Sequence, residues 1–234
     1  MKILLLFGLL HVYVYQQEDF RNIFTFDYQW AVNFMENNKR DMRDVTNDFD
    51  IENSVVIPVL FPEVVRFSLF KNYMETLALE VLYVKFGSDD ADFSIGIFQM
   101  KPSFVENLEE FIDNNHDLKK KYDNIISFHS VRPKKVREER IRRLKTVFWQ
   151  LIYAAAFYDV VQTRFPDKKY HSKEDKIRFF ASAYNHGFTK SEKEIELWID
   201  RAVFPYGTKS TARQYSYSSV SVYFYKNEYM EIFE

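Results

Sequence analysis

The spacing of apolar residues predicts helices along most of the chain. In residues 72–86 apolar side chains recur three or four positions apart, and a glycine then ends the run. That stripe consists of Met74, Leu77, Val81 and Val84, followed by Gly87. Further helices are predicted at 27–48, 103–113, 136–164, 173–184 and 190–202. The pattern predicts an all-α fold with one domain over residues 16–234.

Local signals refine the ends of these helices. Ser103 stands three residues before Glu106, the spacing of a capping box. Pro58 and Pro62 would each cost roughly 3 kcal/mol inside a regular helix. A kink or a helix end is therefore predicted just before Glu63.

The C-terminal tail is the best candidate for a strand. Residues 215–225, YSYSSVSVYFY, are rich in β-branched and aromatic residues and alternate loosely between polar and apolar. An α+β arrangement therefore stays possible at the tail. This aromatic segment predicts either packing over the core or a contact surface.

Composition excludes some classes of function. The formal net charge is −2 over 234 residues, whereas a dedicated nucleic-acid binder is normally basic overall. No nucleic-acid partner is therefore expected. The chain has no cysteine, and no two of its five histidines stand four positions apart. Neither thiolate chemistry nor a metal site is predicted.

The N-terminus predicts a location. Residues 1–15 begin with one lysine and continue with a mostly apolar run from Ile3 to Tyr15. As a helix this run spans roughly 20 Å, which is too short for a hydrocarbon core of about 30 Å. The pattern is typical of a secretory signal peptide, which would leave no transmembrane span after its removal. A buried N-terminal element is the alternative.

The segment KKVREERIRRLK, residues 134–145, is strongly basic. It is interpreted either as a surface that attracts an anionic polymer or as the solvated half of a helix. The second interpretation is favoured, because Val136, Ile141 and Leu144 supply an apolar face.

Glu63 has the most apolar neighbours of any acidic residue in the chain. It follows Leu60, Phe61 and Pro62 and precedes Val64 and Val65. Desolvation disfavours a charged carboxylate, so a raised pKa and use as a general acid are predicted. The structural alternative is a buried glutamate neutralised by Arg66, three residues further along the helix.

Gly96 is a rare glycine inside an apolar run, which indicates backbone with a positive φ or a close approach. Its segment is SIGIFQMKP, and a second segment, SAYNHGF, lies at 182–188. Together they resemble two motifs of the lytic transglycosylases, which share their fold with goose-type lysozymes. The matching residues are Gly96, Ile97, Phe98, Gln99, Pro102, Ala183, Tyr184, Asn185 and Gly187.

A third match places Glu63 at the position of the catalytic glutamate, after a turn and a helix over 49–63. The segments FPEVVRFS and FSIGIFQMKPSF look like a divergent bacterial envelope subgroup with proline before that glutamate. The resemblance covers roughly 49–190 in patches. It implies a lysozyme-like fold, a periplasmic or cell-surface location and peptidoglycan glycan strands as partner.

The resemblance also implies roles for the matched residues. Glu63 would be the acid and base that cleaves between N-acetylmuramic acid and N-acetylglucosamine, with no cofactor. Gly96, Phe98 and Gln99 would form the floor, wall and polar contact of a sugar groove. Tyr184 would orient Glu63, and Asn185 would bind the sugar.

The chain departs from the family in two ways. Val64 stands where the family usually has serine, and Glu63 lies 33 residues before Gly96, which indicates an inserted helix. Glu80 is therefore a rival catalytic residue, and Glu75 is a candidate second carboxylate. The alternative function is a catalytically silent lysozyme-like module that binds glycan or an envelope protein.

Overall fold

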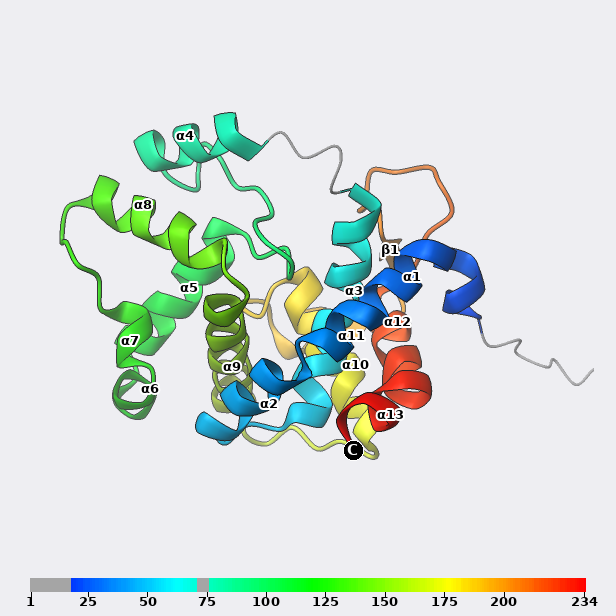
Figure 1. Cartoon of the computed structure of the whole chain (residues 1–234). Coiled ribbons are helices and arrows are strands. Elements are labelled where there is room, and N and C mark those ends of the chain that lie inside the picture. The colour runs from blue at the N-terminus through cyan, green and yellow to red at the C-terminus, as the bar shows by residue number, and fades with distance from the viewer. Residues whose placement is uncertain (1–17, 71–75) are drawn as a thin grey trace, which may run out of the picture.

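A computed structural model describes residues 18–70 and 76–234 of the chain. The predicted signal segment, Met74 and Glu75 lie outside the described residues. The described chain is almost entirely helical, with one small two-stranded sheet near the C-terminus (Figure 1). The all-α prediction is thereby confirmed, with the sheet confined to the tail.

The N-terminal half contains α1 (Phe20–Asn37), α2 (Lys39–Asp48), α3 (Asn53–Phe70), α4 (Thr76–Phe86) and α5 (Pro102–Asp113). The middle of the chain forms α6 (His116–Lys121), α7 (Asp123–Ile126), α8 (Pro133–Leu144), α9 (Val147–Arg164), α10 (Lys173–His186) and α11 (Glu192–Trp198). The tail forms β1 (Ala202–Phe204), β2 (Tyr215–Ser216), α12 (Tyr217–Phe224), a π-helical segment (Tyr225–Tyr229) and α13 (Met230–Phe233).

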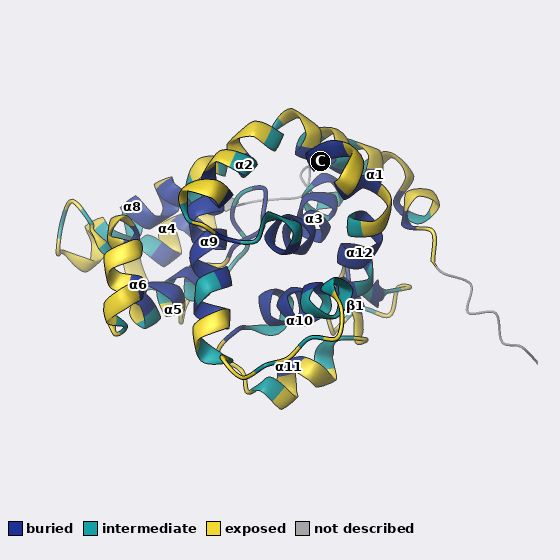
Figure 2. Ribbon diagram, turned by 90° about the horizontal axis from the view of Figure 1, so that it is seen from below, coloured by how far each residue is buried: buried dark blue, intermediate teal, exposed yellow. Residues whose placement is uncertain are grey.

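Helix α3 is the central helix of the fold. It packs against α1, α10 and α12, while α9 joins this group to α2, α5 and α8. Figure 2 shows dark, buried surfaces on α3, α9 and α10 and exposed surfaces on the peripheral α6 and α11. Among the described residues α3 alone is long and apolar enough to cross a membrane, but 67% of that window is buried inside the protein. Such burial is typical of a core helix.

The prolines do not end α3. The helix continues through Pro58 and Pro62 to Phe70, so the predicted end before Glu63 is wrong. Each proline removes one backbone donor. Packing on all sides offsets this loss, because every residue from Val55 to Val65 is buried.

Two predicted helices are each divided in two. The helix over 27–48 breaks at Asn38, between α1 and α2. The helix over 136–164 breaks at Lys145 and Thr146, where the Thr146 hydroxyl accepts a hydrogen bond from the Trp149 N–H and so begins α9. The apolar spacing continues across this break, which explains the error.

Two other local predictions are also wrong. Helix α5 begins at Pro102, and Ser103 does not cap it. The Glu106 carboxylate accepts hydrogen bonds from Tyr83, Ser88 and Arg140 instead of completing a capping box. Residues 217–224 form a helix, because Ser216 caps it and buried residues recur at helical spacing. The apolar stripe of α4 is divided, since Leu77 and Val81 are exposed whereas Val84 packs against the core.

The basic segment forms α8, and only part of it is solvated. Arg140 and Arg143 are buried. Arg140 donates to Glu109 at 2.5 Å, and Tyr153 donates to the same carboxylate at 2.8 Å. Both arginines therefore belong to the interior, where a charge needs hydrogen-bonded partners.

Replacing Arg140 tests this interpretation. We expect Arg140→Ala to lower the free energy of unfolding by roughly 3–5 kcal/mol, because Glu109 stays buried without its cation. Lys135→Ala on the same helix is the control, since Lys135 pairs with an exposed glutamate and its loss should change little. Urea unfolding measures both. Equal effects of the two substitutions would show that Arg140 is only a surface cation.

Candidate functional site

The site is centred on a buried ion pair within α3. The Glu63 side chain is 4% exposed, and Arg66 Nη1 donates to its two carboxylate oxygens at 2.7 and 2.8 Å. Residues three apart on a helix share one face, so the chain itself places this pair. Arg66 also donates from Nε to the Pro205 carbonyl at 3.1 Å and lies 5.0 Å from the Phe204 ring centroid. The guanidinium is thus fixed on both sides.

Burial governs the protonation of Glu63. Desolvation raises the pKa of this carboxyl above its ordinary value, while the charge and hydrogen bonds of Arg66 oppose that increase. The Tyr217 hydroxyl and the Lys101 charge oppose it more weakly. The net result is a carboxyl that holds its proton to higher pH than an exposed glutamate does.

Tyr217 adds a second hydrogen-bonding group beside the carboxyl. Its hydroxyl donates to the Val59 carbonyl at 2.9 Å and also interacts with Glu63. A hydroxyl has a single proton, so Tyr217 can donate to the carboxylate only by releasing Val59. The protonation of Glu63 therefore depends on how α12, which carries Tyr217, packs against α3.

The segment around Gly96 forms a tight turn. Ile95 and Met100 pair through two backbone hydrogen bonds of 2.9 and 3.1 Å. Within the turn Gly96 has φ +70° and Gln99 has φ +50°. The predicted positive φ at Gly96 is therefore confirmed, and Gln99 also adopts this uncommon conformation.

Gln150 of α9 holds this turn in place. Its Oε1 accepts from the Phe98 N–H at 2.9 Å, and its Nε2 donates to the carbonyls of Ile95 and Leu144 at 2.6 and 2.8 Å. A Cβ on Gly96 would lie 2.4 Å from the Leu144 oxygen. Position 96 therefore requires glycine, because its backbone lies against the Leu144 carbonyl at the end of α8 and the Gln150 side chain of α9.

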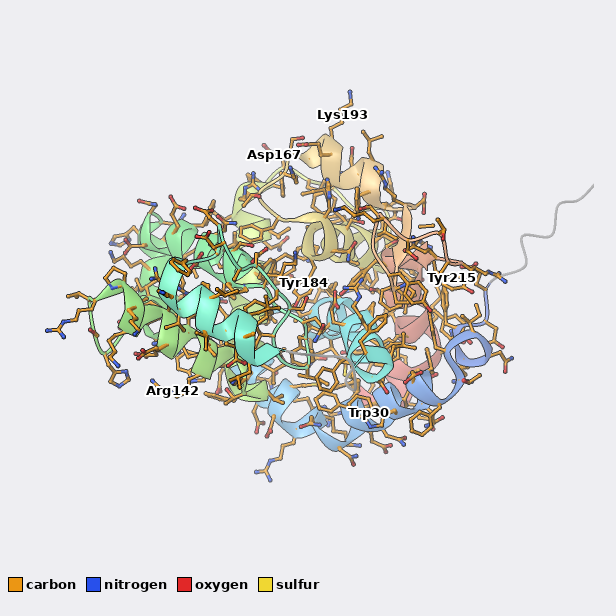
Figure 3. The ribbon with its side chains drawn as sticks, turned by 90° about the horizontal axis from the view of Figure 1, so that it is seen from above. Trp30, Arg142, Asp167, Tyr184, Lys193 and Tyr215 are labelled. Atoms are coloured by element: carbon orange, nitrogen blue, oxygen red, sulfur yellow. The ribbon has the colours of Figure 1, made fainter. Side chains whose placement is uncertain are left out.

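Tyr184 of α10 connects the turn to Glu63. Its hydroxyl donates to the Phe98 carbonyl at 2.8 Å, in place of the predicted bond to Glu63. Burial and the nearby Glu63 charge both raise the pKa of Tyr184. Tyr184 is buried, and Figure 3 shows it near the middle of the molecule in a view from above. Tyr184 therefore joins α10 to the turn, with the Glu63 carboxyl of α3 close enough to affect its hydroxyl.

Other predicted residues have different surroundings. The Phe98 ring is fully buried and contacts Phe34, so it belongs to the core. Gln99 donates from Nε2 to the Gly96 carbonyl at 2.8 Å, inside its own turn. Asn185 Oδ1 accepts from Trp198 Nε1 at 3.0 Å. Glu80 pairs with Lys145 at 2.7 Å.

The Glu63 carboxyl is enclosed by the protein, and its direct partner Arg66 is only partly exposed. Glu63, Gln99 and Tyr184 are each buried, and none of them lines the three cavities described, of about 290, 740 and 300 Å³. The Arg66 side chain is 18% exposed and that of Lys101 is 53% exposed. A ligand oxygen that approaches the carboxyl must therefore compete with Arg66.

Three residues of this site are not recognisable from motifs. Tyr217 lies in the segment that alternates like a strand, far along the chain from Glu63. Lys101 is one of many lysines. Gln150 gives the clearest signal, because it is a single amide inside the apolar run FWQLIYAAAF, and a buried amide must find partners.

No family model, curated protein or solved structure matches this chain. The function is therefore argued from the geometry of the site.

Gly96→Ala tests the packing of the turn on α9. Gly207 is a matched control, because its φ is +84° and a Cβ added there would have no atom within 4 Å. We expect Gly207→Ala to cost about 1–2 kcal/mol of unfolding free energy from backbone strain alone. Gly96→Ala should cost roughly 1–3 kcal/mol more, because the Cβ contacts Leu144 and Gln150. Equal costs, measured by urea unfolding, would contradict the close approach.

Proposed function

We propose that this protein cleaves peptidoglycan glycan strands between N-acetylmuramic acid and N-acetylglucosamine, in the manner of the lytic transglycosylases. The observation that carries the proposal is the meeting of three segments around one buried carboxyl. The Tyr184–Phe98 hydrogen bond joins α10 to the turn at 96–99, and the charge of Glu63 on α3 acts on the same Tyr184 hydroxyl. These are the segments that resemble the family's motifs.

Glu63 is suited to act first as an acid. A carboxyl with a raised pKa retains a proton that it can donate to the bridging glycosidic oxygen. The bond from that oxygen to the muramic acid anomeric carbon then breaks. The carboxylate left behind takes a proton from the muramic acid 6-hydroxyl, whose oxygen attacks the anomeric carbon and gives a 1,6-anhydro product. The substrate supplies the nucleophile, so one carboxylate is sufficient.

Arg66 has two effects on this chemistry. It fixes the carboxylate through two hydrogen bonds and stabilises the negative charge that appears after proton donation. By the same contact it lowers the pKa of Glu63 and competes with a substrate oxygen. In this mechanism the substrate must weaken the Glu63–Arg66 contact before the proton can move.

The same ion pair favours a second candidate function. Because Arg66 occupies both oxygens of a buried Glu63, and because Val64 replaces the usual serine, the domain could bind glycan or an envelope protein without cleaving it. A hydrolytic muramidase is a third possibility, and it would require a second carboxyl such as Glu75 to activate water.

Digestion of purified peptidoglycan separates these functions. We expect the full chain to release soluble fragments with 1,6-anhydromuramic acid ends, identified by mass spectrometry. Glu63→Gln should lower the rate by roughly 10²–10⁴-fold, because it removes the general acid. Glu80→Gln is the matched control, since Glu80 is also a buried, ion-paired glutamate, and it should retain activity.

Other products would identify the other candidates. Reducing ends that disappear in Glu63→Gln would make the protein a hydrolase. Loss of activity in Glu80→Gln alone would assign the acid to Glu80. If neither protein releases fragments while both sediment with the peptidoglycan, the binding module is correct.

The pH profile tests the effect of Arg66. Activity that requires protonated Glu63 falls as the pH rises through the pKa of that carboxyl. Arg66 lowers this pKa, so Arg66→Met should raise it further and move the alkaline limb of the profile to higher pH. Arg132→Met, at an exposed position before α8, should leave the limb unchanged. A limb that moves to lower pH in Arg66→Met would contradict the assignment.

A further inference from the structure

Tyr217 is the first residue of α12, and its hydroxyl reaches the backbone of α3. The side chain is buried, and the hydroxyl donates to the Val59 carbonyl at 2.9 Å. In a helix a carbonyl points toward the backbone of the residue four positions later, which for Val59 is Glu63. The bond to Val59 therefore brings the phenolic oxygen to the level of Glu63, and the Glu63 carboxyl interacts with it.

The ring of Tyr217 is fixed by its neighbours. The Arg66 guanidinium carbon lies 5.9 Å from the ring centroid, and the Phe204 ring makes an edge-to-face contact with centroids 5.8 Å apart. The Tyr184 ring stacks on the same ring with centroids 6.5 Å apart. The phenolic oxygen therefore keeps its place, whereas the hydroxyl proton can rotate about the C–O bond.

Two acceptors compete for this proton. The Val59 carbonyl lies inside α3, where helical geometry directs the Glu63 N–H to it, so the bond from Tyr217 is a second one. Its loss leaves the carbonyl with a donor. A charged Glu63 carboxylate is the stronger acceptor, because hydrogen bonds to ionised groups are roughly twice as strong as neutral ones. The direction of the hydroxyl therefore depends on the charge of Glu63 and on its other partners.

The neighbouring groups offer no equivalent donor. The Tyr184 hydroxyl donates to the Phe98 carbonyl at 2.8 Å, and Phe98 lies in a turn, where no helical donor replaces that bond. Lys101 acts on Glu63 only weakly, through its charge. Within the described part of the chain, Tyr217 is thus the hydroxyl best placed to replace a hydrogen bond of the Glu63–Arg66 pair.

We propose that Tyr217 is a positioning residue for Glu63, and that it donates its hydroxyl hydrogen bond to the carboxylate when a ligand draws Arg66 away. This role rests on the function proposed above. While Glu63 is protonated or bonded to Arg66, Tyr217 donates to Val59. Once Glu63 has given its proton to the glycosidic oxygen, the Tyr217 O–H turns to the carboxylate and holds it in place. Tyr217 keeps its own proton, and its O–H returns to Val59 when the carboxylate takes the proton of the 6-hydroxyl.

A carboxyl titration tests this role without any glycan. In the full chain with isotope-labelled glutamate carboxyls, NMR follows Glu63 in Arg66→Met and in Arg66→Met with Tyr217→Phe. Phenylalanine removes the hydroxyl and keeps the ring. We expect the added substitution to raise the Glu63 pKa by roughly 1–2 pH units, because the charged carboxylate loses its remaining direct donor. With Arg66 present, Tyr217→Phe should raise it by a smaller amount.

Tyr184→Phe is the matched control, because Tyr184 is also buried and its ring stacks on that of Tyr217. Both phenylalanine variants should lower the unfolding midpoint similarly, since each removes one buried hydrogen bond. Tyr184→Phe should leave the Glu63 titration in the Arg66→Met chain nearly unchanged. An unchanged Glu63 titration in Tyr217→Phe, or an equal rise in both variants, would overturn the proposal. If Arg66→Met does not fold, Tyr217→Phe alone decides, and the absence of any rise there overturns the proposal.

Peptidoglycan digestion separates this role from the proposed function. If the unchanged chain releases anhydro fragments, Tyr217→Phe should lower the rate at saturating peptidoglycan roughly tenfold, because the hydroxyl acts after the substrate has bound. An unchanged rate would contradict the positioning role. If the unchanged chain releases no fragments, the proposed function fails, while the Glu63 titration still decides whether Tyr217 donates to the carboxylate.

Discussion

The Glu63–Arg66 contact is the constraint on which the centre of this structure depends. Every residue of α3 from Val55 to Val65 is buried, and an ionisable group placed in this stretch requires a partner within reach. Arg66 is that partner, and the Pro205 carbonyl and the Phe204 ring fix it in turn. The tail of the chain is therefore needed to hold a charge that the first third of the chain introduces.

The same environment explains both candidate functions. Desolvation favours a neutral Glu63 that can donate a proton, and Arg66 favours a charged Glu63 that stays in place. A ligand that weakens the arginine contact shifts this balance toward the protonated form. Without such a ligand Arg66 occupies both oxygens of Glu63, and the ion pair has only a structural role. The two candidate functions thus differ in one respect. Catalysis requires that glycan displace the Arg66 guanidinium from Glu63, whereas binding without cleavage does not.

Local sequence patterns predicted part of this structure, and the reasons for their failures are physical. Helical spacing located most helices, and the apolar neighbours of Glu63 predicted its burial correctly. The strand predicted at 215–225 is a helix over most of its length, because Ser216 supplies a cap and the core accepts an aromatic stripe there. Apolar spacing located α4 but not which of its residues are buried, because spacing shows that a face exists and does not show what covers it.

The site itself combines predictable and unpredictable parts. A positive φ at Gly96 could be inferred from the rarity of glycine, but its packing against Gln150 depends on tertiary structure. The bond from Tyr184 to the Phe98 carbonyl and the position of Tyr217 depend on how α10 and α12 pack against α3. Spacing along the chain carries no information on such contacts.

Burial should keep Glu63 protonated to a higher pH than an ordinary glutamate, and the proposed chemistry depends on this. An NMR titration of isotope-labelled glutamate carboxyls measures this directly, with the Glu63 resonance assigned by its absence in Glu63→Gln. We expect this resonance to titrate above those of the exposed glutamates. A Glu63 resonance that titrates with or below them would show that the Arg66 contact outweighs burial, and would contradict a general acid at this position.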